Sequence, residues 1–145
     1  MMKNKQVLDV QQMQRLKEMG LKLKWDTMLS WIVDERGKDK PLLCISQEAT
    51  DYVDYSHYCI PAYTLQDVLD ALPNIVLDEE GTKYYLQIEQ MNSEFDDWRV
   101  SYKSAAHDES PLGYFQAFHL MDAAVRMLVL CAENFYVKRT KTNEV

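Results

Sequence analysis

Glycine is scarce in this chain, which has only four in 145 residues. The Gly-x-x-x-x-Gly-Lys loop that cradles nucleotide phosphates is absent, and so is the Gly-x-Ser-x-Gly turn that carries a nucleophilic serine. Gly20, Gly37, Gly81 and Gly113 are isolated from one another, and we expect each of them at a turn or a helix end. The sequence therefore contains none of the short glycine motifs of common enzyme classes.

Cysteine is rare as well. Cys44, Cys59 and Cys131 are odd in number and far apart, which is not the pattern of a disulfide framework. No run of about 18 apolar residues exists, so we expect neither a membrane-spanning helix nor a membrane partner. No apolar segment of the secretory type follows the first residues. These absences predict a cytoplasmic protein with reduced thiols.

Basic residues are outnumbered, because 16 Lys and Arg face 23 Asp and Glu and leave a formal net charge of −7. Nucleic acid is an unfavourable partner for such a chain, since phosphate contacts require Lys and Arg. The length is that of one domain, and 47% hydrophobic residues are enough for a core. We therefore expect a single domain over residues 1–145, with residues 138–145 as a frayed polar tail.

The first helix has clear start and stop signals. Asp9 is a good N-cap, and Gln12 at the N3 position completes a capping box. Gly20 stands where a left-handed residue is needed, and Leu21 can fold back onto Leu16 in a Schellman motif. The pattern predicts a helix over residues 10–19.

A second helix starts with the same capping pattern. Thr64 is the predicted N-cap and Asp67 is at N3, while Tyr63 and Val68 form a hydrophobic staple. Because Pro73 disfavours the helical conformation at the residue before it, this helix should be short and should cover residues 65–72.

Four segments have the character of strands. Residues 25–33 and 41–46 are apolar runs that flank a charged turn containing a glycine, which predicts a β-hairpin. Residues 84–91 and 98–104 alternate between apolar and polar side chains, which is typical of antiparallel strands with one wet face.

The last helix is predicted to start at Ser110 as N-cap and Pro111 as N1, and to continue to Tyr136. Apolar side chains from Tyr114 to Ala132 fall on one broad helical arc. The resulting fold class is α+β. We expect one antiparallel sheet of about four strands with three helices packed mainly on one of its faces. The strand order and the conformation of residues 47–60 stay open.

Candidate chemistry is sparse. His57 and Cys59 would share one face of a strand, but a structural zinc site normally shows two pairs of ligands, and only one pair is present. Adjacent carboxylates such as Asp96 and Asp97 lie in a polar link that offers no burial to shift a pKa. Cys131 has the position of a small core residue. We therefore expect no metal, no cofactor and no catalytic residue.

One segment stands out as a binding surface. It contains Tyr52, Asp54, Tyr55, His57 and Tyr58. Tyrosines supply rigid contact area with a polar tip, and acidic neighbours select a basic partner. In the alternative interpretation, the rings lie over the sheet and only their hydroxyls reach water.

A second candidate is the stripe of His119, Asp122 and Arg126 on the polar arc of the last helix. His119 would be the titrating group of this stripe. The alternative is a solvated helix face on which Asp122 and Arg126 form an ordinary ion pair worth about 0.2–0.5 kcal/mol.

Part of the chain resembles known sequences. Residues 60–73 are similar to a segment of small uncharacterised proteins of gut Bacteroidales and of their phages or mobile elements. The spacing of Met13, Leu16 and Gly20 and the closing segment 124–134 are similar in style. The resemblance implies a small accessory protein of a mobile element, and no site residue is transferred from it.

Three functions follow from these observations. The first is a non-enzymatic accessory or regulatory domain that binds another protein, preferably a basic one. The second is a small-ligand binder or enzyme with a pocket between sheet and helices, for which His119 or His57 would be the titrating group. The third is a homo-oligomeric structural protein whose tyrosine surface is its own interface.

Overall fold

The computed structural model describes residues 7–24, 26–91, 94, 97–104 and 112–134. It confirms the α+β class and the antiparallel pairing of the strands. Two sheets of three and four strands replace the single sheet that the sequence predicts, and the described residues form four α-helices instead of three. The number of sheets depends on contacts between distant segments, which local patterns do not encode. None of the described helices is long and apolar enough to cross a membrane.

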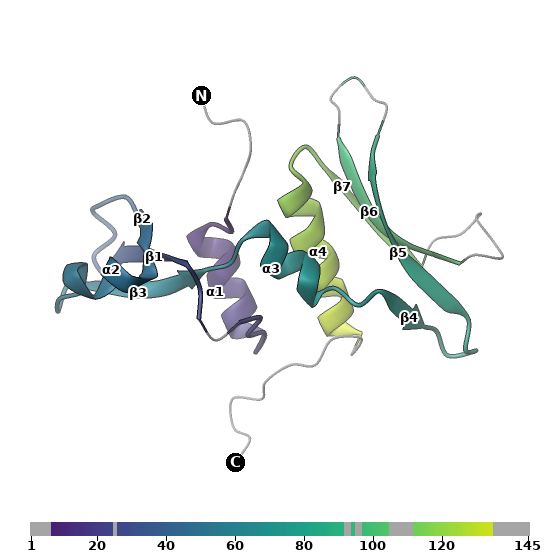
Figure 1. Cartoon of the computed structure of the whole chain (residues 1–145), viewed down its shortest axis with the longest axis horizontal. Helices are drawn as coiled ribbons and strands as arrows, with labels where there is room; N and C mark the ends of the chain where they lie inside the picture. Colours follow the sequence, from purple (N-terminus) through teal and green to yellow (C-terminus); the bar gives the residue numbers. More distant parts are fainter. Residues whose placement is uncertain (1–6, 25, 92–93, 95–96, 105–111, 135–145) are drawn as a thin grey trace, which may run out of the picture.

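The larger part of the molecule, here called the main body, contains the four-stranded sheet. Its strands lie in chain order: β4 (Ile75–Leu77), β5 (Lys83–Gln90), β6 (Trp98–Ser104) and β7 (Gly113–Ala117). Helix α4 (Leu120–Glu133) packs across one face of this sheet, against β6 and β7 (Figure 1). Helix α3 (Leu65–Ala71) packs against α4. The buried core therefore lies around α4, where this helix meets the sheet, and extends to α3 and the segment at residues 8–21.

The remaining strands form what we call the small lobe, residues 29–62. Strand β1 (Leu29–Asp34) lies between β2 (Leu42–Ile45) and β3 (His57–Ala62), and both pairings are antiparallel. A one-turn helix α2 (Ser46–Ala49) and a 3₁₀ turn η1 (Thr50–Tyr52) connect β2 to β3. Figure 1 places this lobe at one end of the molecule and β5–β7 at the other end.

Helix α1 (Val10–Glu18) lies between the two parts (Figure 1) and confirms the first predicted helix. Its capping box is complete, because Gln12 N donates to Asp9 Oδ1 at 2.8 Å and Asp9 N donates to Gln12 Oε1 at 3.1 Å. Leu21 N donates to Leu16 O at 2.9 Å across Gly20, whose φ is +75°. This is the predicted Schellman motif, in which a side chain at Gly20 would be strained.

The second predicted helix is confirmed as α3. Asp67 N donates to the Thr64 hydroxyl at 3.2 Å, and Thr64 N donates to Asp67 Oδ2 at 3.0 Å. The helix ends at Ala71 because Leu72, which precedes Pro73, adopts an extended conformation.

The predicted strands are confirmed with shifted ends. The hairpin around the charged turn is β1 and β2, and β1 starts at Leu29 instead of Trp25, which lies outside the described residues. Strands β5 and β6 match the two alternating segments, and the buried Val100 and Tyr102 share the face that the alternation predicts. Strand β4 was not predicted. Residues 47–60, left open by the sequence, contain most of α2, η1 and the first part of β3.

The prediction for the start of the last helix is wrong. Residues 113–117 form strand β7, and α4 begins only at Leu120, after the N-cap His119. The predicted start at Ser110 and Pro111, and the predicted end at Tyr136, lie outside the described residues. The spacing of Tyr114 and Phe118 suits a helix, but the backbone of this segment hydrogen-bonds to β6 instead.

Gly113 was expected at a turn or a helix end and is instead the first residue of β7. A Cβ atom at this position would lie 3.0 Å from Leu130 Cδ2. A glycine here allows α4 to approach the edge strand closely.

Candidate functional site

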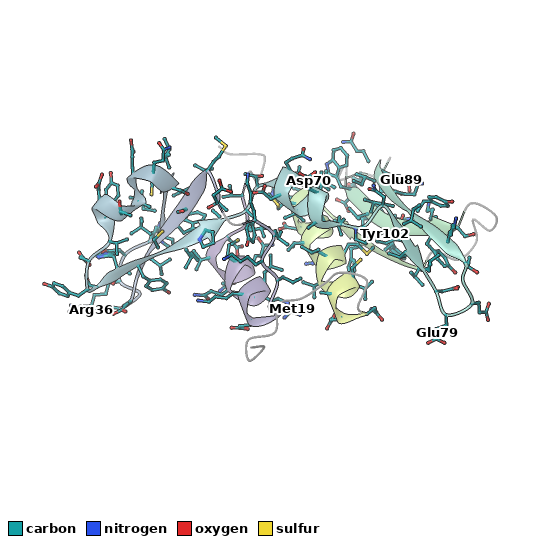
Figure 2. The ribbon with its side chains drawn as sticks, turned by 60° about the horizontal axis from the view of Figure 1, so that its bottom comes forward. Met19, Arg36, Asp70, Glu79, Glu89 and Tyr102 are labelled. Atoms are coloured by element: carbon teal, nitrogen blue, oxygen red, sulfur yellow. The ribbon has the colours of Figure 1, made fainter. Side chains whose placement is uncertain are left out.

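The described surface has a hollow of about 310 Å³ at the outer end of the small lobe, which we call the tip hollow. It is the place where the turn after β1, the start of β2, η1 and the start of β3 meet. Figure 2 shows this end of the molecule through Arg36, which projects far from Tyr102 in the main body. The lining residues are Ile32, Asp34, Asp39, Lys40, Leu42, Tyr52, Asp54 and His57.

Asp34 organises the turn on one side of the tip hollow. Its carboxylate accepts backbone N–H bonds from Arg36 at 3.0 Å, Lys38 at 3.2 Å and Asp39 at 3.1 Å. The bond from Arg36, followed by that from Asp39, lowers the pKa of Asp34 below its ordinary value. Only 9% of Asp34 is exposed, so its carboxylate places a fixed negative charge on this side of the hollow.

His57 forms the opposite side. Its Nδ1 atom lies 3.1 Å from Asp54 Oδ1 and 3.0 Å from the Ser56 hydroxyl. Its Nε2 atom lies 3.5 Å from Asp39 Oδ2. The hydrogen bond to Asp54 raises the pKa of His57 above its ordinary value. The imidazole is thus held between two carboxylates that come from different segments of the chain.

Asp54 fixes this arrangement locally. Its Oδ1 atom accepts the backbone N–H of Ser56 at 2.8 Å and that of His57 at 2.9 Å. The Ser56 hydroxyl donates to the same atom at 2.8 Å. These bonds, with the Ser56 backbone bond first, lower the pKa of Asp54 to about 2. Asp54 is therefore an anion throughout the physiological range.

The structure brings together part of the predicted tyrosine segment. Tyr52, Asp54 and His57 line the tip hollow, whereas Tyr55 is 94% exposed beside it. Tyr58 lies on the other face of β3, because successive residues of a strand point to opposite sides. His57 and Cys59 share a face, as the strand hypothesis required. Tyr58 is half-buried and does not belong to the tip hollow.

Sequence reasoning missed Asp34 and Asp39 as members of this site. They were interpreted only as part of a charged turn. The pairing of Asp34 with His57 in the β1–β3 ladder brings the turn to the histidine. No local pattern specifies that pairing, since 22 residues separate the two positions.

The predicted stripe on the last helix is divided by the structure. His119 is the N-cap of α4, and its ring makes an edge contact with Phe118 at 5.0 Å between ring centroids. Asp122 Oδ1 accepts a hydrogen bond from Gln12 Nε2 of α1 at 3.0 Å. Asp122 and the exposed Arg126 line a groove of about 430 Å³ between α1, α4 and β7, and His119 does not line it.

The remaining candidate residues that the structure describes, Cys131 and Asp97, have contacts typical of structural residues. Cys131 is 1% exposed and burial raises the pKa of its thiol, as expected of a core residue. Asp97 accepts a hydrogen bond from Gln116 Nε2 at 3.2 Å, and its neighbour Asp96 lies outside the described residues. Comparison with protein-family models, with curated proteins and with solved structures found no match, so the site is interpreted from its geometry.

Proposed function

We propose that this protein is a non-enzymatic binding module that docks another protein on the outer end of the small lobe. The observation that carries the proposal is a cluster of exposed apolar side chains around the tip hollow. Leu42, Tyr52, Val53 and Tyr55, which we call the tip surface, are exposed by 51%, 50%, 44% and 94%. Large apolar side chains gathered in this way are typical of protein interaction sites.

The small lobe contributes little to the main core. Every fully buried member of the core cluster comes from the main body or from the segments at residues 8–21 and 63, and only partly buried side chains such as Trp31 and Ile60 reach it from the lobe. Packing of the main core therefore does not explain why the lobe presents apolar side chains at its outer end. Binding of another protein would bury those side chains and so remove their apolar surface from water.

Charge favours a basic partner. The small lobe has six carboxylates against three Lys and Arg, and residues 46–62 contain three carboxylates with no Lys or Arg. Asp34 and Asp54 are held in the ionised state beside the exposed Tyr52 ring. A Lys- or Arg-rich segment would meet complementary potential there, with tyrosine as the apolar anchor.

The test is an affinity capture at physiological salt combined with photo-crosslinking. A photoreactive phenylalanine analogue would replace Tyr55 in one variant and Tyr114, an exposed tyrosine of the main body, in the other. We expect the first variant to crosslink a captured protein through a basic segment, and the second to crosslink nothing. The double substitution Tyr52→Ala and Tyr55→Ala should abolish capture, whereas Tyr114→Ala should preserve it.

Two results would overturn the proposal. The first is equal capture by the double variant, provided that circular dichroism shows it to be folded. The second is a mass that rises with protein concentration in analytical ultracentrifugation and returns to the monomer value in the double variant. That result would identify the tip surface as a self-association interface.

A second function has support from one observation. The groove between α1 and α4 has an apolar floor that includes Leu16, Phe115 and Val129. Arg15 and Arg126 line it together with Asp122 and Glu133, so both signs of charge are present. Its volume falls in the range of small-molecule sites, roughly 300–1,000 Å³. An amphipathic carboxylate could place its chain on the apolar floor and its charged group against Arg126, which lies one helical turn from Asp122 on α4. A nuclear magnetic resonance titration with octanoate should shift the amides of α1 and α4, and the substitution Arg126→Gln should weaken that shift.

A further inference from the structure

We propose that Asp34, Asp39 and His57 bind a divalent transition-metal ion of the zinc class in the tip hollow. The sequence predicted no metal site, because His57 and Cys59 form only one ligand pair. The fold adds two carboxylates from the turn after β1. One ligand atom from each of the three residues lies within 4.8 Å of the others. The proposal does not require the proposed function, although both place Asp34 at the tip hollow, and its test uses the isolated protein.

The imidazole is oriented as a metal-binding histidine is. Metal-ligating histidines usually hold one ring nitrogen in a hydrogen bond to a carboxylate, so that the other nitrogen faces the metal. Asp54, backed by Ser56, engages Nδ1 of His57 at 3.1 Å. Nε2 is the atom that faces Asp39. Asp54 therefore acts as a positioning residue that supports the Nδ1–H tautomer and directs Nε2 toward the carboxylates.

The spacing suits an ion between the groups better than direct contact between them. The distance of 3.5 Å from His57 Nε2 to Asp39 Oδ2 exceeds the usual length of an N–H···O bond, about 2.7–3.2 Å. Two ligands that bind a tetrahedral zinc ion at about 2.1 Å lie about 3.4 Å apart. The third ligand atom, from Asp34, lies within 4.8 Å of these two, so the exposed Asp39 side chain and the imidazole would have to move toward Asp34 to enclose an ion.

Asp34 supplies the fixed ligand. It is almost fully buried, and three backbone N–H groups hold its carboxylate in place. A carboxylate has about four acceptor positions, so these bonds leave room for a metal. The ladder pairing of Asp34 with His57 places the two ligands on adjacent strands. The three ligands thus come from β1, the following turn and β3.

The donor set indicates the class of metal. One imidazole nitrogen and two carboxylate oxygens suit zinc and its neighbours in the first transition row better than Ca²⁺, which prefers six to eight oxygens. Three protein ligands leave a position for water. The ion would tie the turn after β1 to the start of β3.

The test is titration of the untagged, reduced protein at pH 7.5 with Zn²⁺ by calorimetry and with Co²⁺ by visible absorption. We expect one saturable site per chain and the absorption bands of a four- or five-coordinate cobalt ion. His57→Gln should lower the affinity at least about tenfold, and Asp54→Asn should lower it by about 10–100-fold through the orientation of the ring. Asp51→Asn, which removes a carboxylate of η1 that does not line the tip hollow, and His119→Gln should leave the affinity unchanged.

Two outcomes would overturn the proposal. One is the absence of saturable binding at metal concentrations up to the millimolar range. The other is binding that persists unchanged in the folded His57→Gln variant, which would place the metal on other residues. The backbone resonances of the apo variants, compared with those of the wild type, separate loss of a ligand from loss of the fold.

Discussion

The main body and the small lobe differ in the size of their buried cores. In the main body, helix α4 covers one face of the four-stranded sheet, and residues such as Val100 and Leu128 are completely buried. The helical segments described within the small lobe are the short α2 and η1, and apolar residues such as Leu42 and Ile45 are about half exposed there. The main core thus lies outside the small lobe, although the main body also exposes apolar side chains such as Ile75, Leu77 and Phe118.

The two regions also differ in whether particular buried polar side chains have hydrogen-bond partners. Ser30 of the lobe is buried, but its hydroxyl lies 2.7 Å from that of Ser46, and Asp34 is satisfied by turn N–H groups. Ser101 of the main body is completely buried, and its hydroxyl has no hydrogen-bond partner among the described residues. The buried polar side chains of Ser30 and Asp34 in the lobe therefore have hydrogen-bond partners, although the lobe has a smaller core.

The largest expected effect concerns the core. Leu128→Ala should lower the free energy of unfolding by about 2–5 kcal/mol, because it leaves a cavity under the sheet. Leu42→Ala in the lobe should change it by less than about 0.5 kcal/mol, because the side chain is half exposed. Urea denaturation followed by circular dichroism measures both. Equal losses of unfolding free energy in the two variants would contradict the placement of the main core outside the small lobe.

Local opening should follow the same division. Backbone amides of β6, such as Val100, should exchange with deuterium only through global unfolding. Those of β1, such as Ile32, should exchange at least about tenfold faster, because the lobe can open while the main core stays folded. Native-state hydrogen exchange by nuclear magnetic resonance provides the measurement. Identical protection would show that both regions unfold as one unit.

A smaller effect distinguishes the two buried serines. Ser30→Ala should cost about 0.5–1.5 kcal/mol, since it removes a hydrogen-bonded hydroxyl and leaves Ser46 without that partner. Ser101→Ala should be neutral or slightly stabilising, because a hydroxyl without a partner is already unfavourable in a buried position. Thermal unfolding of both variants is the measurement. A marked loss for Ser101→Ala alone would refute the comparison.

The smallest effect is a pH dependence confined to the lobe. The raised pKa of His57 means that its contribution to stability is fully present below pH 6.5 and is lost as the pH rises through the folded value. The contribution of Asp54 is present above pH 3.8 and is lost as the pH falls toward about 2. Titration of the His57 ring protons should give a midpoint above 6.5, and Asp54→Asn should move it downward. A midpoint at or below 6.5 with Asp54 intact would contradict the geometry.

Helix ends and turns could be predicted because their signals lie within a few residues. The capping boxes at Asp9 and Thr64, the left-handed Gly20 and the positive φ of Gly81 in its turn were all readable in this way. The alternation in β5 and β6 was similarly local. Residues 113–117 were wrongly assigned to the last helix, because the spacing of Tyr114 and Phe118 fits a helix and the pairing with β6 cannot be read from local sequence.

The candidate site was predictable only in part. Tyr52, Asp54 and His57 were recognised because aromatic and acidic residues interleave within one short segment. Tyr58 was grouped with them on composition, although strand alternation turns it to the other face. Asp34 and Asp39 escaped notice, because their proximity to His57 arises from the pairing of two strands that are distant in the chain.

The sequence by itself determined the α+β class, the caps of α1 and α3, the turns and the acidic character of the tyrosine segment. Each of these depends on interactions among neighbours along the chain or on composition alone. The tertiary structure decided that there are two sheets, that β7 precedes α4, and that Asp34, Asp39 and His57 meet in one hollow. These features depend on which distant segments pair, and that choice is made by the burial and hydrogen bonding of the whole chain at once.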